Sequence, residues 1–141
     1  VTEDELRAAW REGSGWFPWF VTLGDDGTVA GYAKAGSFRA RAAYRWTTET
    51  GIYLAPAMLG RGLGRPLYRT LLDELQVRGF RSAIGGIALP NVASVRLHER
   101  LGFVHVGTIR EAGWKFGAWH DVGFWQLGFA GQEVPPPRGF A

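Results

Sequence analysis

The sequence predicts a mixed α/β domain with one central parallel pair of strands, and three patterns support this fold class. Five leucines fall at helical spacing over residues 62–78 and form one apolar stripe: Leu63, Leu67, Leu71, Leu72 and Leu75. Apolar stretches flank this helix at 46–54 and 80–89, and a strand–helix–strand order is typical of a parallel crossover. Residues 104–109 and 123–129 fit two closing antiparallel strands.

The N-terminal elements follow from local signals. Thr2, with Glu5 three positions later, forms a capping box and predicts a helix over residues 3–12. The turn sequence Asp25-Asp26-Gly27 predicts a hairpin between strands at 16–23 and 29–37. Because this first helix starts almost at Val1, we expect that a further segment precedes it.

The later boundaries are marked by capping residues. Gly79 is expected to end the helix at 62–78, and Asn91 to cap a second helix that runs to Leu101. Residues 39–45 form a polar connection, and residues 110–122, rich in Gly and Trp, are expected to be irregular. We therefore predict one domain over residues 1–130 and a loose Pro-rich tail at 131–141.

Composition excludes several functional classes. The 141 residues are 46% hydrophobic and 21% charged, as in a soluble globular domain, and no apolar run approaches the roughly 20 residues that span a bilayer. The absence of cysteine excludes a disulfide framework, a thiolate nucleophile and a Cys-based zinc site, and fits a cytoplasmic protein. A net charge of +3 from dispersed basic residues indicates a local anionic ligand and no nucleic acid partner.

The loop after the strand at 46–54 has the features of a phosphate cradle. Gly60, Gly62 and Gly64 lead directly into a helix, whose first N–H groups and dipole favour an anion. Arg61 and Arg65 add positive charge beside them. The loop lacks the Gly-Lys-Ser/Thr of a nucleotide P-loop and the spacing of the dinucleotide fingerprint. A glycine-rich turn without a ligand is the alternative.

Longer runs resemble the GNAT superfamily of N-acetyltransferases, and within it the phosphinothricin N-acetyltransferase group. The runs that carry this resemblance lie between residues 18 and 129: Ala43-Tyr44, Trp46-Thr47, Leu89-Pro90-Asn91, residues 94–99 (Ser-Val-Arg-Leu-His-Glu) and residues 119–126 (Trp-His-Asp-Val-Gly-Phe-Trp-Gln). The resemblance implies the mixed-sheet fold of that superfamily, in which a central parallel strand pair splays apart. It also implies that the superfamily's first strand and a helix would precede this chain.

Acetyl-CoA is the co-substrate that the resemblance implies, with no metal. Its diphosphate would be bound by the N–H groups of Gly60, Arg61, Gly62, Leu63, Gly64 and Arg65. Its pantetheine would be bound by the main chain of Ile52, Tyr53 and Leu54, and further polar groups by the side chains of Asn91 and Ser94. The superfamily has Gln or Arg where this chain has Leu59, which cannot donate to a phosphate.

The resemblance places the reaction on two side chains. Glu49 occupies the position of the general base, which would take a proton from the substrate amine. His98, one helical turn after Ser94, would act as the acid or as a proton relay. Their structural alternatives are a hydrogen-bonded carboxylate and a packed helix histidine. The histidine spacing does not fit a metal site, since a zincin would need His where Gly102 stands.

The implied reaction is direct transfer of an acetyl group to the amine of a small amino acid or analogue, of the phosphinothricin or methionine sulfoximine type. Arg41 and Tyr44 are expected to bind that substrate, Arg41 through its carboxylate. A homodimer is expected, with the late Trp- and Phe-rich segment as a contact surface. Two alternatives remain: a non-catalytic acyl-CoA-binding relative and, because the pI is about 9.7, a nucleic-acid-binding module.

Overall fold

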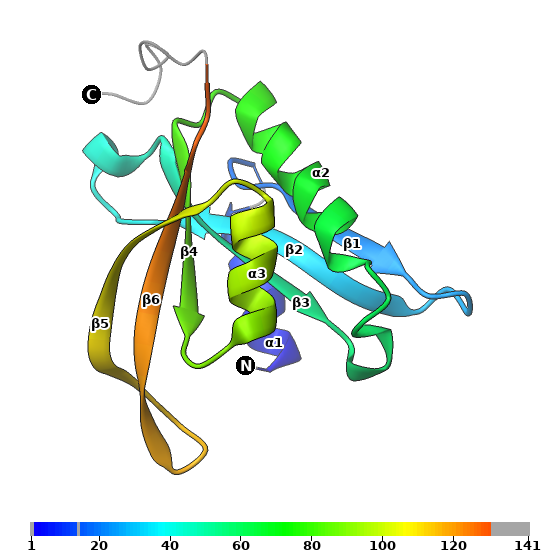
Figure 1. The fold of residues 1–141 in the computed structure, drawn as a ribbon. Helices are drawn as coiled ribbons and strands as arrows, with labels where there is room; N and C mark the ends of the chain where they lie inside the picture. The colour runs from blue at the N-terminus through cyan, green and yellow to red at the C-terminus, as the bar shows by residue number, and fades with distance from the viewer. Residues whose placement is uncertain (1, 14, 131–141) are drawn as a thin grey trace.

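The computed structural model describes residues 2–13 and 15–130, which form a six-stranded mixed sheet with helices on both faces (Figure 1). The strand order is β1-β2-β3-β4-β6-β5. In chain order the elements are α1 (Glu3–Gly13), β1 (Trp19–Leu23), β2 (Val29–Ser37), the 3₁₀ helix η1 (Ala42–Tyr44), β3 (Thr47–Leu54), the 3₁₀ helix η2 (Pro56–Met58), α2 (Gly64–Val77), β4 (Ser82–Ala88), α3 (Val92–Arg100), β5 (Val104–Lys115) and β6 (Ala118–Gly128).

The predicted parallel pair is confirmed and lies at the centre of the sheet. β3 and β4 are paired from Thr47 opposite Ser82 to Thr50 opposite Gly85. Beyond Thr50, β3 continues to Leu54 in register with β2 alone, while β4 continues in register with β6. The two strands therefore separate after Thr50, which leaves one edge of β3 without a neighbouring strand.

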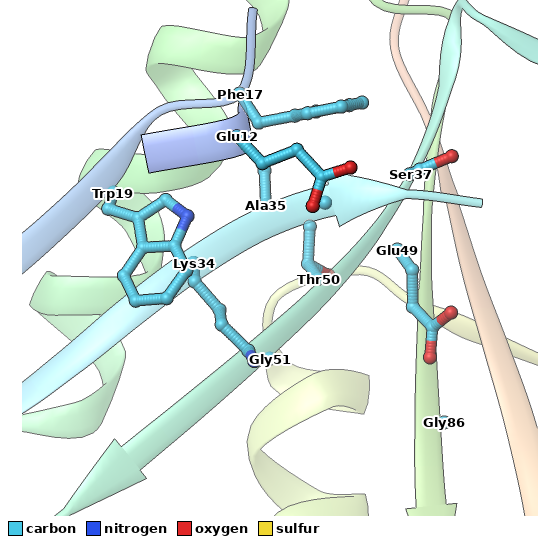
Figure 2. A pocket seen from close by; sticks show the side chains of 11 residues that line it. Glu12, Phe17, Trp19, Lys34, Ala35, Ser37, Glu49, Thr50, Gly51 and Gly86 are labelled. Atoms are coloured by element: carbon cyan, nitrogen blue, oxygen red, sulfur yellow. The ribbon is translucent and has the colours of Figure 1, made fainter. Parts of the chain in front are cut away.

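The two faces of the sheet carry different side chains because residues alternate along each strand. The face under α2 and α3 holds the core, with the α2 leucines Leu67, Leu71, Leu72 and Leu75 buried as predicted and Leu63 half-buried. α1 lies on the opposite face in both views (Figures 1 and 2). On that face β2 presents Tyr32, Lys34 and Gly36, all partly buried.

The capping signals are confirmed. The Oγ1 of Thr2 accepts from the Glu5 N–H at 3.2 Å, and Glu5 accepts from the Thr2 N–H at 2.6 Å, which closes the capping box of α1. The side chain of Asn91 accepts from the Ser94 N–H at 3.1 Å at the start of α3.

The expectation of an irregular segment at 110–122 is wrong. These residues belong to a long β5–β6 hairpin that closes between Lys115 and Ala118. Phe116 and Gly117 both have positive φ (52° and 73°), as a two-residue hairpin turn requires, yet Phe is rare at such a position. A register shift between Ile109 and Gly113 also breaks the alternation of side chains. The predicted tail at 131–141 lies outside the described residues.

Candidate active site

A cavity of about 630 Å³ lies on the α1 face of the sheet, over the point where β3 and β4 separate (Figure 2). Its wall combines the end of α1 with residues of β1, β2, β3 and β4. Glu49 on β3 lines it, and Figure 2 shows the Glu49 carboxylate extending along β4 toward Gly86.

Glycines form much of the floor of this cavity. Gly36 lies directly opposite Glu49, and Gly51 opposite Lys34, across the β2–β3 ladder. A Cβ at Gly86 would lie 3.8 Å from Oε1 of Glu49 and 3.3 Å from the Phe124 ring. The space beside the Glu49 carboxylate therefore exists because no side chain projects from Gly86.

A second cavity of about 410 Å³ adjoins the first and shares Gly86 with it. It is lined by Ile52, Asn91 and Ser94, so the tertiary structure brings together three residues expected at the cofactor site. The hairpin tip closes its far side: His120 lies 3.1 Å from the Leu89 carbonyl through Nδ1 and 3.0 Å from the Lys115 carbonyl through Nε2.

The glycine loop has the backbone geometry that its sequence implies. Gly60 and Gly62 have φ values of +76° and +73°, which L side chains rarely adopt. No side chain caps α2, whose flanking residue Leu63 has helical torsion angles. Gly64 is buried, and a Cβ there would lie 3.4 Å from both Leu54 and Leu97. The uncapped first turn of α2 is thus held closely against the end of β3.

His98 is buried, with only 3% of its surface exposed, and lines neither cavity. Its Nδ1 lies 2.8 Å from the Ser94 carbonyl, and its Nε2 lies 3.0 Å from the Tyr68 hydroxyl. That hydroxyl lies 2.6 Å from Oγ1 of Thr50, which is part of the Glu49 cavity wall. The hydrogen-bonded chain from His98 therefore ends at the Thr50 hydroxyl on the α2 face of β3, whereas Glu49 lies on the α1 face.

Burial sets the charge state of this chain of groups. Desolvation lowers the pKa of His98, although its hydrogen bond to the Ser94 carbonyl opposes that change. Desolvation also raises the pKa of the Tyr68 hydroxyl, and the bond with Thr50 opposes it. Both side chains are therefore neutral near pH 7.

Arg41 and Tyr44 lie outside both cavities. Arg41 is exposed and directly precedes η1, where its carbonyl accepts from the Tyr44 N–H at 3.0 Å. Tyr44 is 41% exposed and packs edge-on against Phe38. The described structure does not bring either residue to Glu49, and their role in substrate binding stays a prediction.

Other wall residues were not expected from the sequence. Three segments before β3 also line the Glu49 cavity: α1 with Glu12, residues 17–19 with Phe17 and Trp19, and β2 with Lys34. One sequence signal could have identified Lys34. It is the one charged residue in the mostly small stretch at 30–36, and it alternates with Ala33 and Ala35, which lie on the other face of the strand. Its proximity to Glu49 depends on strand register, which no local pattern determines.

The described residues contain neither a membrane-spanning helix nor a cluster of metal-binding side chains. Within 2–13 and 15–130, no helix is both long and apolar enough to cross a bilayer. The same part of the chain contains no group of three His, Asp or Glu side chains arranged for a metal ion.

Comparisons with known proteins agree on one family. The sequence model of the Acetyltransferase (GNAT) family matches residues 2–103. A phosphinothricin N-acetyltransferase of Streptomyces viridochromogenes is 50% identical over 123 residues, which cover 86% of this chain and 65% of that protein. An L-methionine sulfoximine/L-methionine sulfone acetyltransferase of Salmonella typhimurium is 39% identical over 90% of this chain and 75% of its own length.

A solved structure extends this similarity to the fold. A GNAT superfamily phosphinothricin acetyltransferase from Sinorhizobium meliloti, in complex with AcCoA, superimposes with a TM-score of 0.90 at 35% identity. The match covers 98% of this chain and 76% of that one. Since the family model covers most of the described residues and the sheet has the same arrangement, the chain belongs to the Acetyltransferase (GNAT) family.

Proposed function

We propose that this chain transfers the acetyl group of acetyl-CoA to the amine of a small amino acid or analogue of the phosphinothricin or methionine sulfoximine type. The observation that carries the proposal is the position of Glu49, whose carboxylate lies beside Gly86 in a cavity where β3 and β4 separate. The names of the relatives support the substrate class.

The residues present suit the co-substrate. Beyond Thr50 the free edge of β3 offers main-chain groups over Gly51–Leu54, and an extended amide chain can pair with such an edge like an added strand. The uncapped first turn of α2 beside Gly60 and Gly62 suits a diphosphate. Acetyl-CoA supplies an acetyl thioester, and Asn91 and Ser94 line the adjoining cavity.

Glu49 is proposed as the general base. An acceptor amine is protonated near neutral pH, and only the free amine can attack a thioester. The Glu49 carboxylate faces the cavity with the glycine floor around it, so an amine can approach it directly or through one water. Attack is proposed to be direct, because the sequence contains no cysteine to carry the acetyl group.

For His98 the proposal is restricted to a proton relay. It contacts the Tyr68 hydroxyl, which in turn contacts the Thr50 hydroxyl on the α2 face of β3, so any proton from His98 would first pass through those two hydroxyls. Direct donation to a leaving thiolate is not proposed, since His98 lines neither cavity.

The test is Glu49→Gln, assayed by release of CoA thiol with L-phosphinothricin and L-methionine sulfoximine as acceptors. The expected loss in kcat/KM is about 10²–10⁴-fold, because Gln cannot take the proton. Glu99→Gln on the exposed surface of α3 is the matched control and should keep the wild-type rate. An unchanged rate in Glu49→Gln would remove Glu49 from the mechanism. Binding of acetyl-CoA without thiol release for any amine would favour a non-catalytic relative.

A further inference from the structure

Lys34 is the cation of the Glu49 cavity. Among the wall residues, all of which belong to the described part of the chain, it is the only basic side chain, and the same wall contains two acidic ones, Glu12 and Glu49. Figure 2 shows the Lys34 side chain extending across the cavity floor toward Gly51. Neither Arg41 nor any other arginine contributes to this wall.

Strand register holds Lys34 in this position. It lies opposite Trp19 on β1 and opposite Gly51 on β3, while Glu49 lies opposite Gly36. Lys34 and Glu49 are therefore diagonal neighbours on one face of an antiparallel pair, a relationship that separates residues by roughly 7–8 Å. A small zwitterion between the two side chains could reach both.

Gly51 provides the path for the lysine stem. A Cβ at Gly51 would lie 3.9 Å from Cε of Lys34, so a larger side chain there would compete for the space that the stem crosses. On the other side, Nζ lies 5.4 Å from the centroid of the Trp19 ring. This cation–π contact holds the ammonium group without neutralising its charge.

The charge of Lys34 has no carboxylate partner in the described residues, since none lies within 4.0 Å of its Nζ. The residue is half-buried, and an ammonium group in a concave, partly desolvated site interacts more strongly with an anion than one on an open surface. The cavity thus combines a carboxylate that can bind an amine with a cation that can bind an anionic group.

We propose that Lys34 binds the anionic group of the acceptor amino acid while Glu49 receives its amine. This inference rests on the proposed function and assigns the anion-binding role to a residue inside the cavity. The shared chemistry is an oxyanion, either the α-carboxylate of the acceptor or a distal phosphinate. Lys34 acts by binding and orienting the acceptor, and takes no part in proton transfer.

The test compares Lys34→Met with Lys34→Arg and with Arg100→Met, which removes one exposed charge at the end of α3. Acceptors are L-methionine sulfone, which has only the α-carboxylate, its carboxamide, which has none, and L-phosphinothricin, which adds a distal phosphinate. Lys34→Met should raise the acceptor KM at least 10-fold with little change in kcat or in the KM of acetyl-CoA. Lys34→Arg should recover most of this loss, and Arg100→Met should show none.

Comparison of the three acceptors shows which anionic group Lys34 binds. A larger KM for both anionic acceptors and not for the carboxamide assigns Lys34 to the α-carboxylate, whereas a change for phosphinothricin alone assigns it to the phosphinate. Equal changes for the sulfone and its carboxamide, or equal changes in Lys34→Met and Arg100→Met, would overturn the proposal.

Calorimetric titration of each of the three acceptors into the wild type and each variant, in the presence of CoA, separates this inference from the proposed function. Binding that depends on Lys34 without turnover would support the subsite and contradict the enzymatic role. Normal turnover with unchanged binding in Lys34→Met would contradict the subsite alone. If the wild type binds none of the three acceptors, the proposal fails as well.

Discussion

The hydroxyl of Tyr68 lies 3.0 Å from Nε2 of His98, and this contact joins α2 to α3 in the core. The donor and the acceptor of this hydrogen bond follow from the groups next to it. The Ser94 carbonyl can only accept, so Nδ1 of His98 carries the proton and Nε2 accepts from Tyr68. The Tyr68 oxygen then accepts from the Thr50 hydroxyl. His98, Tyr68 and Thr50 therefore each have a hydrogen-bond partner.

Tyr68→Phe should lower the free energy of unfolding by about 1–3 kcal/mol, because it leaves the buried Thr50 hydroxyl and His98 Nε2 without their partner. Urea denaturation followed by circular dichroism measures this loss. Tyr44→Phe, which removes an exposed hydroxyl, is the matched control and should stay within about 0.5 kcal/mol of the wild type. Equal stabilities of the two variants would show that the hydrogen-bonded chain adds nothing.

Stability should fall as the pH drops below about 6.5. Burial lowers the pKa of His98 in the folded state, so between that pKa and the ordinary value of 6.5 the unfolded state binds a proton that the folded state does not. The free energy of unfolding should therefore decrease by up to about 1.4 kcal/mol per pH unit in this window, and level off below the folded pKa.

Urea titrations between pH 7.5 and pH 5.5 measure this slope. His98→Gln should remove it, whereas His105→Gln, at an exposed position on β5, should retain it. A slope that persists in His98→Gln would assign the proton uptake to another group.

Leu59→Arg should strengthen the binding of acetyl-CoA by up to about five-fold, equivalent to the roughly 0.2–1 kcal/mol that an exposed ion pair contributes. Leu59 is 63% exposed and ends η2 at the glycine loop, so an arginine there has room to reach a phosphate. Fluorescence titration measures the dissociation constant, and the gain should shrink at high salt. Val77→Arg adds the same charge at the opposite end of α2 and should have no such effect. Equal gains in both variants would indicate nonspecific attraction.

Phe116→Asp should give a monomer, where we expect the wild-type chain to form a homodimer. Phe116 is 91% exposed at the hairpin tip, with Trp114 and Trp119 62% and 58% exposed beside it, and a second copy of this chain is the occupant that we propose for this apolar surface. Asp tolerates the positive φ of this position, so the turn should survive. Light scattering after size exclusion measures the mass. Val77→Asp, at another exposed apolar residue, should remain dimeric, and a monomeric wild type would contradict the prediction.

The element order was predictable because its signals are local. The capping pair Thr2 and Glu5, the leucine spacing of α2 and the Asn91 cap each involve residues within a few positions, and all three are confirmed. The antiparallel strands at 104–109 and 123–129 are confirmed as parts of β5 and β6. Their extension through residues 110–122 was missed because the turn places Phe116 at positive φ, where the expected residue is Asn, Asp or Gly. The bulge near Glu111 is closed by a distant group, since the Glu111 N–H donates to Asp121.

The amino-acid sequence by itself determined the chemistry available to this protein: a carboxylate at Glu49, a histidine at 98 and a glycine-rich turn at a helix start. Only the tertiary structure decided which of these groups meet in one space. It placed Glu49 and Lys34 around one cavity, buried His98 behind Tyr68 and left Arg41 outside. The physical reason is that strand register and the separation of β3 from β4 are set by packing between distant segments, and no local pattern encodes them.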